Sequence, residues 1–231
     1  MQGKRSPSPL ARFLRKLPGK RSLPSRKSKT GKPFRLALTF DDGPDPRYTP
    51  ALLDLLAAAE VKATFFVMAP KAEALPELTA RMKAEGHAIG LHGTDHRSLL
   101  RLGPAATEKI FRQGTKQLRK AGCPSPSWYR PPYGRVNPFV FPQLKRHGMR
   151  LLLWDVMVQD WRADATPELL LRKLRRRCRD GAVICLHDAG EGRAAEGAPL
   201  KMMEALRRFL PEMKARGCRF VLPEELNRQE G

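Results

Sequence analysis

Two adjacent carboxylates, Asp41 and Asp42, end a short apolar run in the sequence Thr39-Phe40-Asp41-Asp42-Gly43-Pro44. Residues 36–40 have the composition of a buried strand, and parallel α/β domains bind their ligands where such strands end. An Asp-Gly-Pro sequence is also ordinary turn chemistry. The pair is therefore a candidate ligand-binding site. Whether it is functional depends on which side chains from other segments lie next to it.

Two histidines, His92 and His96, follow another apolar run in the sequence His92-Gly93-Thr94-Asp95-His96. A lone histidine is more often a core or surface residue, but two imidazoles four residues apart can reach one ion from a single turn. Two His and one carboxylate also leave open positions for water and substrate. The histidine pair therefore indicates a catalytic metal site.

Three further segments carry reactive side chains. Arg130 opens the rigid sequence Arg130-Pro131-Pro132-Tyr133-Gly134, while Asp160-Trp161 and His187 each follow later apolar runs. Arginine cannot act as an acid at ordinary pH, so near a catalytic site it would hold a carboxylate and keep it ionised. The alternative is a surface arginine ahead of a Pro-rich turn.

Short apolar runs alternate with helical patterns from Phe34 onward, which predicts a parallel sheet. No glycine-rich dinucleotide or phosphate loop follows any run, and this absence favours a distorted (β/α) barrel of about seven parallel strands over an open sheet. The five reactive segments would then share the catalytic face of the barrel. The expected strands are 36–40, 64–68, 88–92, 127–130, 150–154, 182–186 and 219–221, and the expected helices 50–59, 75–84, 104–120, 138–146, 167–177 and 200–215.

The five segments, in this order and spacing, resemble the motifs of polysaccharide deacetylases with a NodB-homology domain, carbohydrate esterase family 4. The likeness covers about residues 34–223. It implies a deacetylase domain over residues 34–225 that removes the acetyl group from N-acetylglucosamine polymers such as peptidoglycan or chitin, using water activated by a divalent ion. Zinc is the expected ion, with cobalt, nickel or manganese as alternatives.

The resemblance also implies a role for each residue. Asp42, His92 and His96 would bind the ion, and Asp41 would act as the general base. The general acid would be His187. The remaining assignments are that Arg130 holds Asp41, Asp160 tunes His187, the backbone N–H of Tyr133 binds the oxyanion, and Trp161 walls the acetyl pocket or packs in the core.

Three residues depart from the family pattern. Gly93 stands where the family usually has Ser or Thr, so a hydrogen bond that stiffens the histidine loop is expected to be missing. Met157 replaces the first Asp of the family's Asp-x-x-Asp-Trp pattern. Cys185, within an expected strand, replaces a common pocket-lining Leu. We expect these changes to affect substrate fit more than the catalytic set.

Basic residues are concentrated at the N-terminus. Residues 1–35 hold twelve of the 44 Lys and Arg and no acid, which leaves a formal charge of +9 of the total +21 for the rest. We expect residues 1–33 to be a disordered tail, with an amphipathic stretch at 10–17 that could contact an anionic membrane or cell-wall surface. No specific nucleic acid is expected, because no aromatic-rich recognition motif accompanies the charge.

Targeting and cysteine usage add little to this prediction. No apolar run of seven or more residues follows the basic start, so we expect a cytoplasmic or peripheral membrane protein, or a cell-envelope protein if the natural start lies upstream. The cysteines show no metal-finger spacing and are expected to be free thiols. They are Cys123, Cys178, Cys185 and Cys218.

Two other functions stay open at the sequence level. A hydrolase on the same scaffold could remove an acyl or formyl group from a small or lipid-linked sugar at the inner membrane face, which fits the basic tail. A non-catalytic protein could bind an anionic polymer, with an affinity that falls steeply with salt. All metal and acid/base positions of the motifs are occupied, which favours an enzyme.

Overall fold

The strands form one parallel sheet that curls into a barrel. The computed structural model describes residues 34–190 and 194–226. Its strands are β1 (Arg35–Asp41), β2 (Thr64–Met68), β3 (Ala88–Gly93), β4 (Trp128–Tyr129), β5 (Arg150–Leu151), β6 (Val156–Met157), β7 (Ala182–His187) and β8 (Arg219–Phe220).

Neighbouring strands follow the chain order around the ring. The hydrogen-bonded order is β5-β4-β3-β2-β1-β7-β6, and β8 pairs with the start of β1. Every pair is parallel. Within the described residues β5 and β6 do not pair, so the barrel stays open there. The predicted distorted (β/α) barrel is confirmed.

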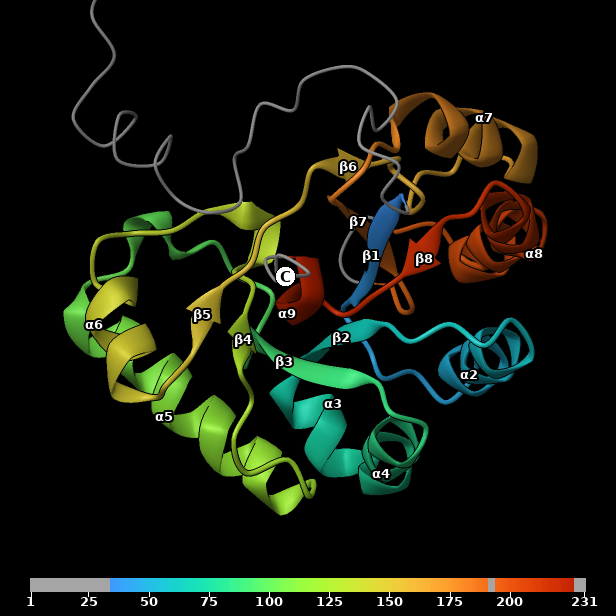
Figure 1. Ribbon diagram of the computed structural model, residues 1–231. Coiled ribbons are helices and arrows are strands. Elements are labelled where there is room, and N and C mark those ends of the chain that lie inside the picture. Colours follow the sequence, from blue (N-terminus) through green and yellow to red (C-terminus); the bar gives the residue numbers. More distant parts are fainter. Residues whose placement is uncertain (1–33, 191–193, 227–231) are drawn as a thin grey trace, which may run out of the picture.

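Helices surround the ring of strands, with α2 to α8 on its outside (Figure 1). Six of them, α2, α3, α4, α5, α7 and α8, have proline in the first turn, where its missing N–H costs no hydrogen bond. The helices are α2 (Thr49–Ala58), α3 (Ala69–Ala74), α4 (Pro76–Ala84), α5 (Pro104–Lys120), α6 (Val140–Arg146), α7 (Pro167–Arg177), α8 (Ala198–Ala215) and α9 (Pro223–Leu226), with short 3-10 turns η1 (Leu99–Arg101) and η2 (Pro132–Gly134).

The alternation of side chains along each strand divides the core in two. In β1, Leu36, Leu38 and Phe40 belong to the large apolar cluster shared with the helices. The intervening positions face the barrel interior, where the apolar part is small and consists of Ala37, Phe66, Trp128, Leu152 and Val183. Strand positions two apart share a face. The same alternation therefore turns Asp41 toward the barrel interior, at the C-terminal end of β1.

Helix α9 closes the opposite end of the barrel. It lies at the centre of the ring of strands in Figure 1. Glu224 accepts a hydrogen bond from the indole N–H of Trp128, at the start of β4. The Glu225 carbonyl accepts one from Arg35, at the start of β1, at 3.2 Å. The carboxyl ends of the strands, where the reactive segments lie, are therefore left as the accessible mouth.

Several element boundaries differ from the sequence prediction. The expected strand 150–154 ends after two residues, and β6 follows as a separate strand that periodicity did not indicate. Helices α3 and α9 were also not predicted. The basic tail at 1–33, with its stretch at 10–17, lies outside the described residues. In the ranges that are described, no helix combines the length and apolarity needed to cross a membrane.

Candidate active site

Three side chains from two connections converge on one point at the mouth of the barrel. Asp42 follows β1, His92 lies near the end of β3, and His96 lies in the loop after it. The Nε2 atoms of His92 and His96 lie 3.3 Å and 3.2 Å from Oδ1 of Asp42. One ligand atom from each residue lies within 4.8 Å of the others, which makes the group a candidate metal site.

The geometry of this group fits a bound divalent cation. Two ligand atoms on a tetrahedral zinc ion, with bonds of about 2.0–2.1 Å, lie roughly 3.3 Å apart, which matches both separations. Oδ1 of Asp42 is buried and has no hydrogen-bond partner among the described residues, a costly state for an oxygen with no ion to bind. Asp42 also has a φ of 78°, which turns it out of the strand direction.

Hydrogen bonding fixes the histidine rings and the charge of Asp42. Nδ1 of His92 lies 2.7 Å from the carbonyl oxygen of Arg130, so this nitrogen is the donor and Nε2 keeps its lone pair for a ligand. Burial alone would raise the pKa of Asp42, but the neighbouring imidazoles of His92 and His96 lower it well below the ordinary value. An ionised Asp42 carboxylate is the state that could bind a cation.

Arg130 holds the second carboxylate, Asp41. Its Nη1 donates to Oδ1 of Asp41 at 2.7 Å, with the guanidinium fully buried and the carboxylate 4% exposed. The same nitrogen donates to the Thr39 hydroxyl at 2.7 Å. Thr39 lies two residues before Asp41 on β1, so the alternation of the strand could have revealed its place beneath the site.

The rest of the Arg130 guanidinium bridges the open side of the barrel. Nε donates to the Leu152 carbonyl and Nη2 to the Leu153 carbonyl, both at 3.1 Å, in the connection between β5 and β6. The guanidinium also lies over the Phe66 ring at 4.0 Å and near Trp154 at 5.6 Å. Neither aromatic residue was singled out from the sequence.

His187 lies at the end of β7 and is held by Asp160. The Asp160 carboxylate accepts from the His187 backbone N–H at 2.8 Å and lies 3.0 Å from Nδ1 of its ring. Nε2 is therefore left to face the site. Burial would lower the pKa of His187, but the Asp160 charge and hydrogen bond raise it to about 9. This imidazole is thus a proton donor at neutral pH.

Two aromatic residues flank the histidines at the mouth. Tyr133 is 57% exposed and has a φ of 60°, and its ring meets that of His96 edge-on at 4.7 Å. Trp161 meets the ring of His187 edge-on at 4.9 Å. Both are therefore positioned beside groups that would surround a bound substrate, and neither lies in the main apolar cluster.

The comparison with known families decides what this arrangement is. Residues 28–152 match the polysaccharide deacetylase family model, which is more than half of the chain. The chain belongs to the polysaccharide deacetylase family. The matched range contains Asp41, Asp42, His92, His96 and Arg130, whereas Asp160 and His187 lie beyond it.

Family relatives extend the likeness over most of the chain. A Bacillus cereus peptidoglycan-N-acetylglucosamine deacetylase is 36% identical over 195 residues, which cover 84% of this chain and 88% of that protein. A Listeria monocytogenes enzyme with the same described activity is 34% identical, and the match covers 90% of this chain but 43% of that longer protein. A family 4 acetyl xylan esterase from Clostridium thermocellum, solved with a cobalt ion, superposes with a TM-score of 0.75 at 30% identity, covering 83% of this chain and 89% of that one.

The three departures from the polysaccharide deacetylase pattern have distinct structural settings. Gly93 has a φ of 138°, a backbone conformation that side chains rarely adopt, so glycine suits the bend between the two histidines. Met157 is half-buried on β6, and its carbonyl accepts from Arg177. Cys185 is fully buried, and its thiol donates to Oδ2 of Asp41 at 3.3 Å.

Sequence reasoning gave no role to Asp188, although it directly follows His187. This buried carboxyl accepts a hydrogen bond from the Thr49 hydroxyl at 2.7 Å, and the same hydroxyl accepts one from the Asp45 backbone N–H at 2.8 Å. Burial raises the pKa of Asp188 to about 7. It packs against Gly43 so closely that a Cβ there would meet Oδ2 at 2.1 Å. Asp188 thus shapes the loop that carries Asp42.

Proposed function

We propose that this chain is a metal-dependent hydrolase that removes the acetyl group from N-acetylglucosamine units of a glycan, peptidoglycan or a chitin-like polymer. One observation carries the proposal: a three-ligand cation site lies at the mouth of the barrel together with a carboxylate held by Arg130 and an imidazole held by Asp160. The described activities of the Bacillus cereus and Listeria monocytogenes relatives support the choice of substrate.

The resident ion proposed for Asp42, His92 and His96 is zinc. A carboxylate and two imidazoles are a donor set that zinc takes in hydrolytic sites, and the 3.2–3.3 Å separations suit its tetrahedral geometry. When bound, such a cation supplies a Lewis acid that polarises the amide carbonyl and lowers the pKa of water towards about 7. Cobalt, nickel and manganese are the alternatives that metal analysis would distinguish.

The two flanking groups carry out the proton transfers. Asp41 accepts the proton of the attacking water, and the hydrogen bond from Arg130 fixes the direction of this carboxylate. His187 donates the Nε2 proton to the leaving amine, because its Nδ1 is engaged by Asp160. Proton transfers of this kind contribute about 10²- to 10⁴-fold each, so both residues are needed for turnover.

The aromatic residues at the mouth are proposed to receive the acetyl group. The backbone N–H of Tyr133, in a turn with φ of 60°, would donate to the developing oxyanion. Trp161, edge-on to His187, would form an apolar wall for the methyl group. These assignments place the scissile amide between Asp41 and His187.

Acetate release from N-acetylglucosamine oligomers tests the proposal. We expect release by the metal-loaded protein, its loss with a chelator, and loss of both bound metal and activity in Asp42→Ala. The matched control is Asp54→Ala, which removes a carboxylate that is 71% exposed and should keep metal and activity. Full metal content in Asp42→Ala would show that the ligand assignment is wrong, and a metal-loaded protein that releases no acetate would contradict the activity.

A further inference from the structure

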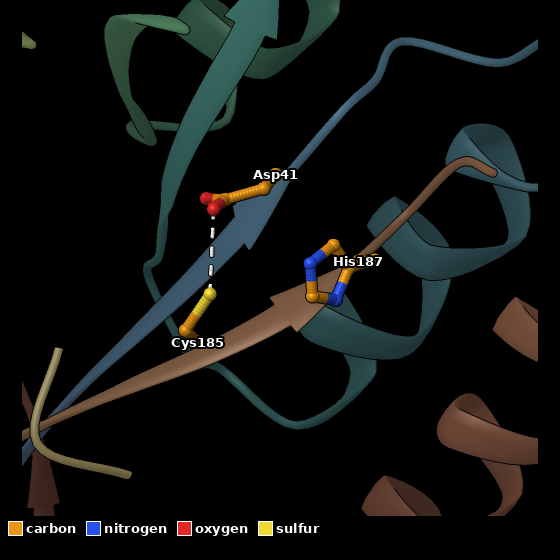
Figure 2. A group of neighbouring side chains, drawn as sticks. All are labelled: Asp41, Cys185 and His187. Atoms are coloured by element: carbon orange, nitrogen blue, oxygen red, sulfur yellow. Dashed lines mark hydrogen bonds between the residues drawn. The ribbon is translucent and has the colours of Figure 1, made fainter. Parts of the chain in front are cut away.

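A second cluster of metal-ligating atoms lies beside the first and has a different chemical character. It consists of Asp41, Cys185 and His187, whose ligand atoms lie within 4.8 Å of one another. They come from the adjacent strands β1 and β7, where Asp41 and His187 are paired in register. Figure 2 shows the thiol of Cys185 beneath the Asp41 carboxylate and a ring nitrogen of His187 turned toward both.

The shape of this group suits a soft divalent cation. On a tetrahedral zinc ion with bonds of about 2.3 Å to sulfur and 2.0 Å to oxygen, these two atoms lie roughly 3.5 Å apart, close to the 3.3 Å between Sγ of Cys185 and Oδ2 of Asp41. The other Asp41 oxygen bonds to Arg130, and Nδ1 of His187 lies against Asp160. Oδ2, Sγ and Nε2 are therefore the atoms free to ligate.

The local charge also permits a cation next to a buried arginine and the resident ion. An incoming divalent ion replaces the thiol proton of Cys185 and the Nε2 proton of His187, and both protons leave to solvent. Two positive charges depart and two arrive, so the net charge that Arg130 experiences does not change. A thiolate ligand selects ions of the zinc and cadmium type over magnesium or calcium.

We propose that Asp41, Cys185 and His187 form a second, inhibitory binding site for a thiophilic divalent cation. The ion would occupy the general base and the general acid together, so the protein would hold two ions and lose turnover. The resident ion at Asp42, His92 and His96 would stay in place. The inhibition rests on the proposed deacetylation, whereas occupancy of the site can be measured with no substrate present, so the failure of either one can be told from the failure of the other.

Cadmium binding to protein that already holds one equivalent of zinc tests the site. We expect one further equivalent of cadmium per chain, an ultraviolet charge-transfer band from the cadmium–thiolate bond, and release of about two protons per ion. Cys185→Ser keeps a donor to Asp41 but removes the sulfur, and it should lose the band and the second equivalent while keeping its zinc. Cys218→Ser removes another buried thiol and should behave as the wild type.

Turnover provides the second measurement. Saturating cadmium should lower acetate release by the wild-type chain at least about 100-fold, because both proton transfers are blocked. Half-inhibition of Cys185→Ser, relative to its own uninhibited rate, should need at least tenfold more cadmium. The proposal is overturned if the wild type takes up no second equivalent, if cadmium enters only in exchange for zinc, or if the band survives in Cys185→Ser or disappears in Cys218→Ser.

Discussion

At the residue scale, the buried Arg130 side chain contacts both the barrel backbone and the candidate active site. Its guanidinium donates four hydrogen bonds, one of them to Asp41. Lysine lacks the planar fork that reaches acceptors in several directions. The sequence identified Arg130 through its Pro-rich segment, but its full burial was not predictable, since the acceptors come from segments far apart in the chain.

Removal of this guanidinium should cost both stability and turnover. Arg130→Met leaves the Asp41 charge buried without its partner, which we expect to lower the free energy of unfolding by about 3–5 kcal/mol. Chemical denaturation measures this change, and kcat should fall as well. Arg146→Met, which breaks an exposed pair with Glu108, should cost at most about 1 kcal/mol. Equal stability of the two variants would show that Arg130 does not hold the barrel together.

The Asp160 carboxylate should set the alkaline limit of activity. It raises the pKa of His187 to about 9, so the protonated acid is present at neutral pH and lost as pH rises through that value. Asp160→Asn removes the charge, and the alkaline limb of kcat should move down by about 1–3 pH units. An unmoved limb in this variant would mean that another group supplies the proton.

The same interaction makes stability depend on pH. The folded pKa of His187 lies above its ordinary value of 6.5, so the stabilisation from Asp160 is fully present below about 6.5 and is lost as pH rises through about 9. Between pH 6 and pH 10, the free energy of unfolding measured by urea denaturation should therefore fall more for the wild-type chain than for Asp160→Asn. Equal losses in the two proteins would show that the pair does not contribute.

At the element scale, the loop between β1 and α2 orients Asp42 through a close contact. Gly43→Ala would place a Cβ 2.1 Å from Asp188 Oδ2, so the loop or the buried carboxyl must move. We expect a lower melting temperature and weaker zinc binding by calorimetry. Gly103→Ala, where a Cβ meets nothing within 4 Å, is the matched control. It should change neither the melting temperature nor the zinc affinity. Unchanged zinc affinity in Gly43→Ala would contradict a role for this contact.

The elements that the sequence predicted best are helices of several turns whose first and last residues carry clear signals. Helices α5 and α7 begin at proline and end where expected, because an apolar stripe and a first-turn proline are both local signals. Strands β5 and β6 have two residues each, too few for any periodicity to show. Their positions depend on pairing with neighbours and on Arg130, which is information that no local window contains.

At the scale of the whole molecule, one end of the barrel is closed and the other carries the candidate active site. Helix α9 covers the end where the strands begin, and Asp41, Asp42, His92 and His187 gather where the strands end. The proposed metal ligands come from two regions about fifty residues apart, the residue after β1 and the end of β3 with the loop that follows it. A cation bound by both regions therefore links them in the folded state and has no equivalent site in the unfolded chain.

Zinc should thus stabilise the entire domain. At about 1,000 times the dissociation constant, a ligand that binds only the folded state adds roughly 4 kcal/mol. For a domain of this size that corresponds to a rise in Tm of about 8–16 °C, measurable by thermal melts with zinc and with a chelator. Asp42→Ala should lose most of this rise, whereas Asp54→Ala should keep it. If zinc shifted both variants equally, the stabilising ion would bind somewhere other than between these two regions.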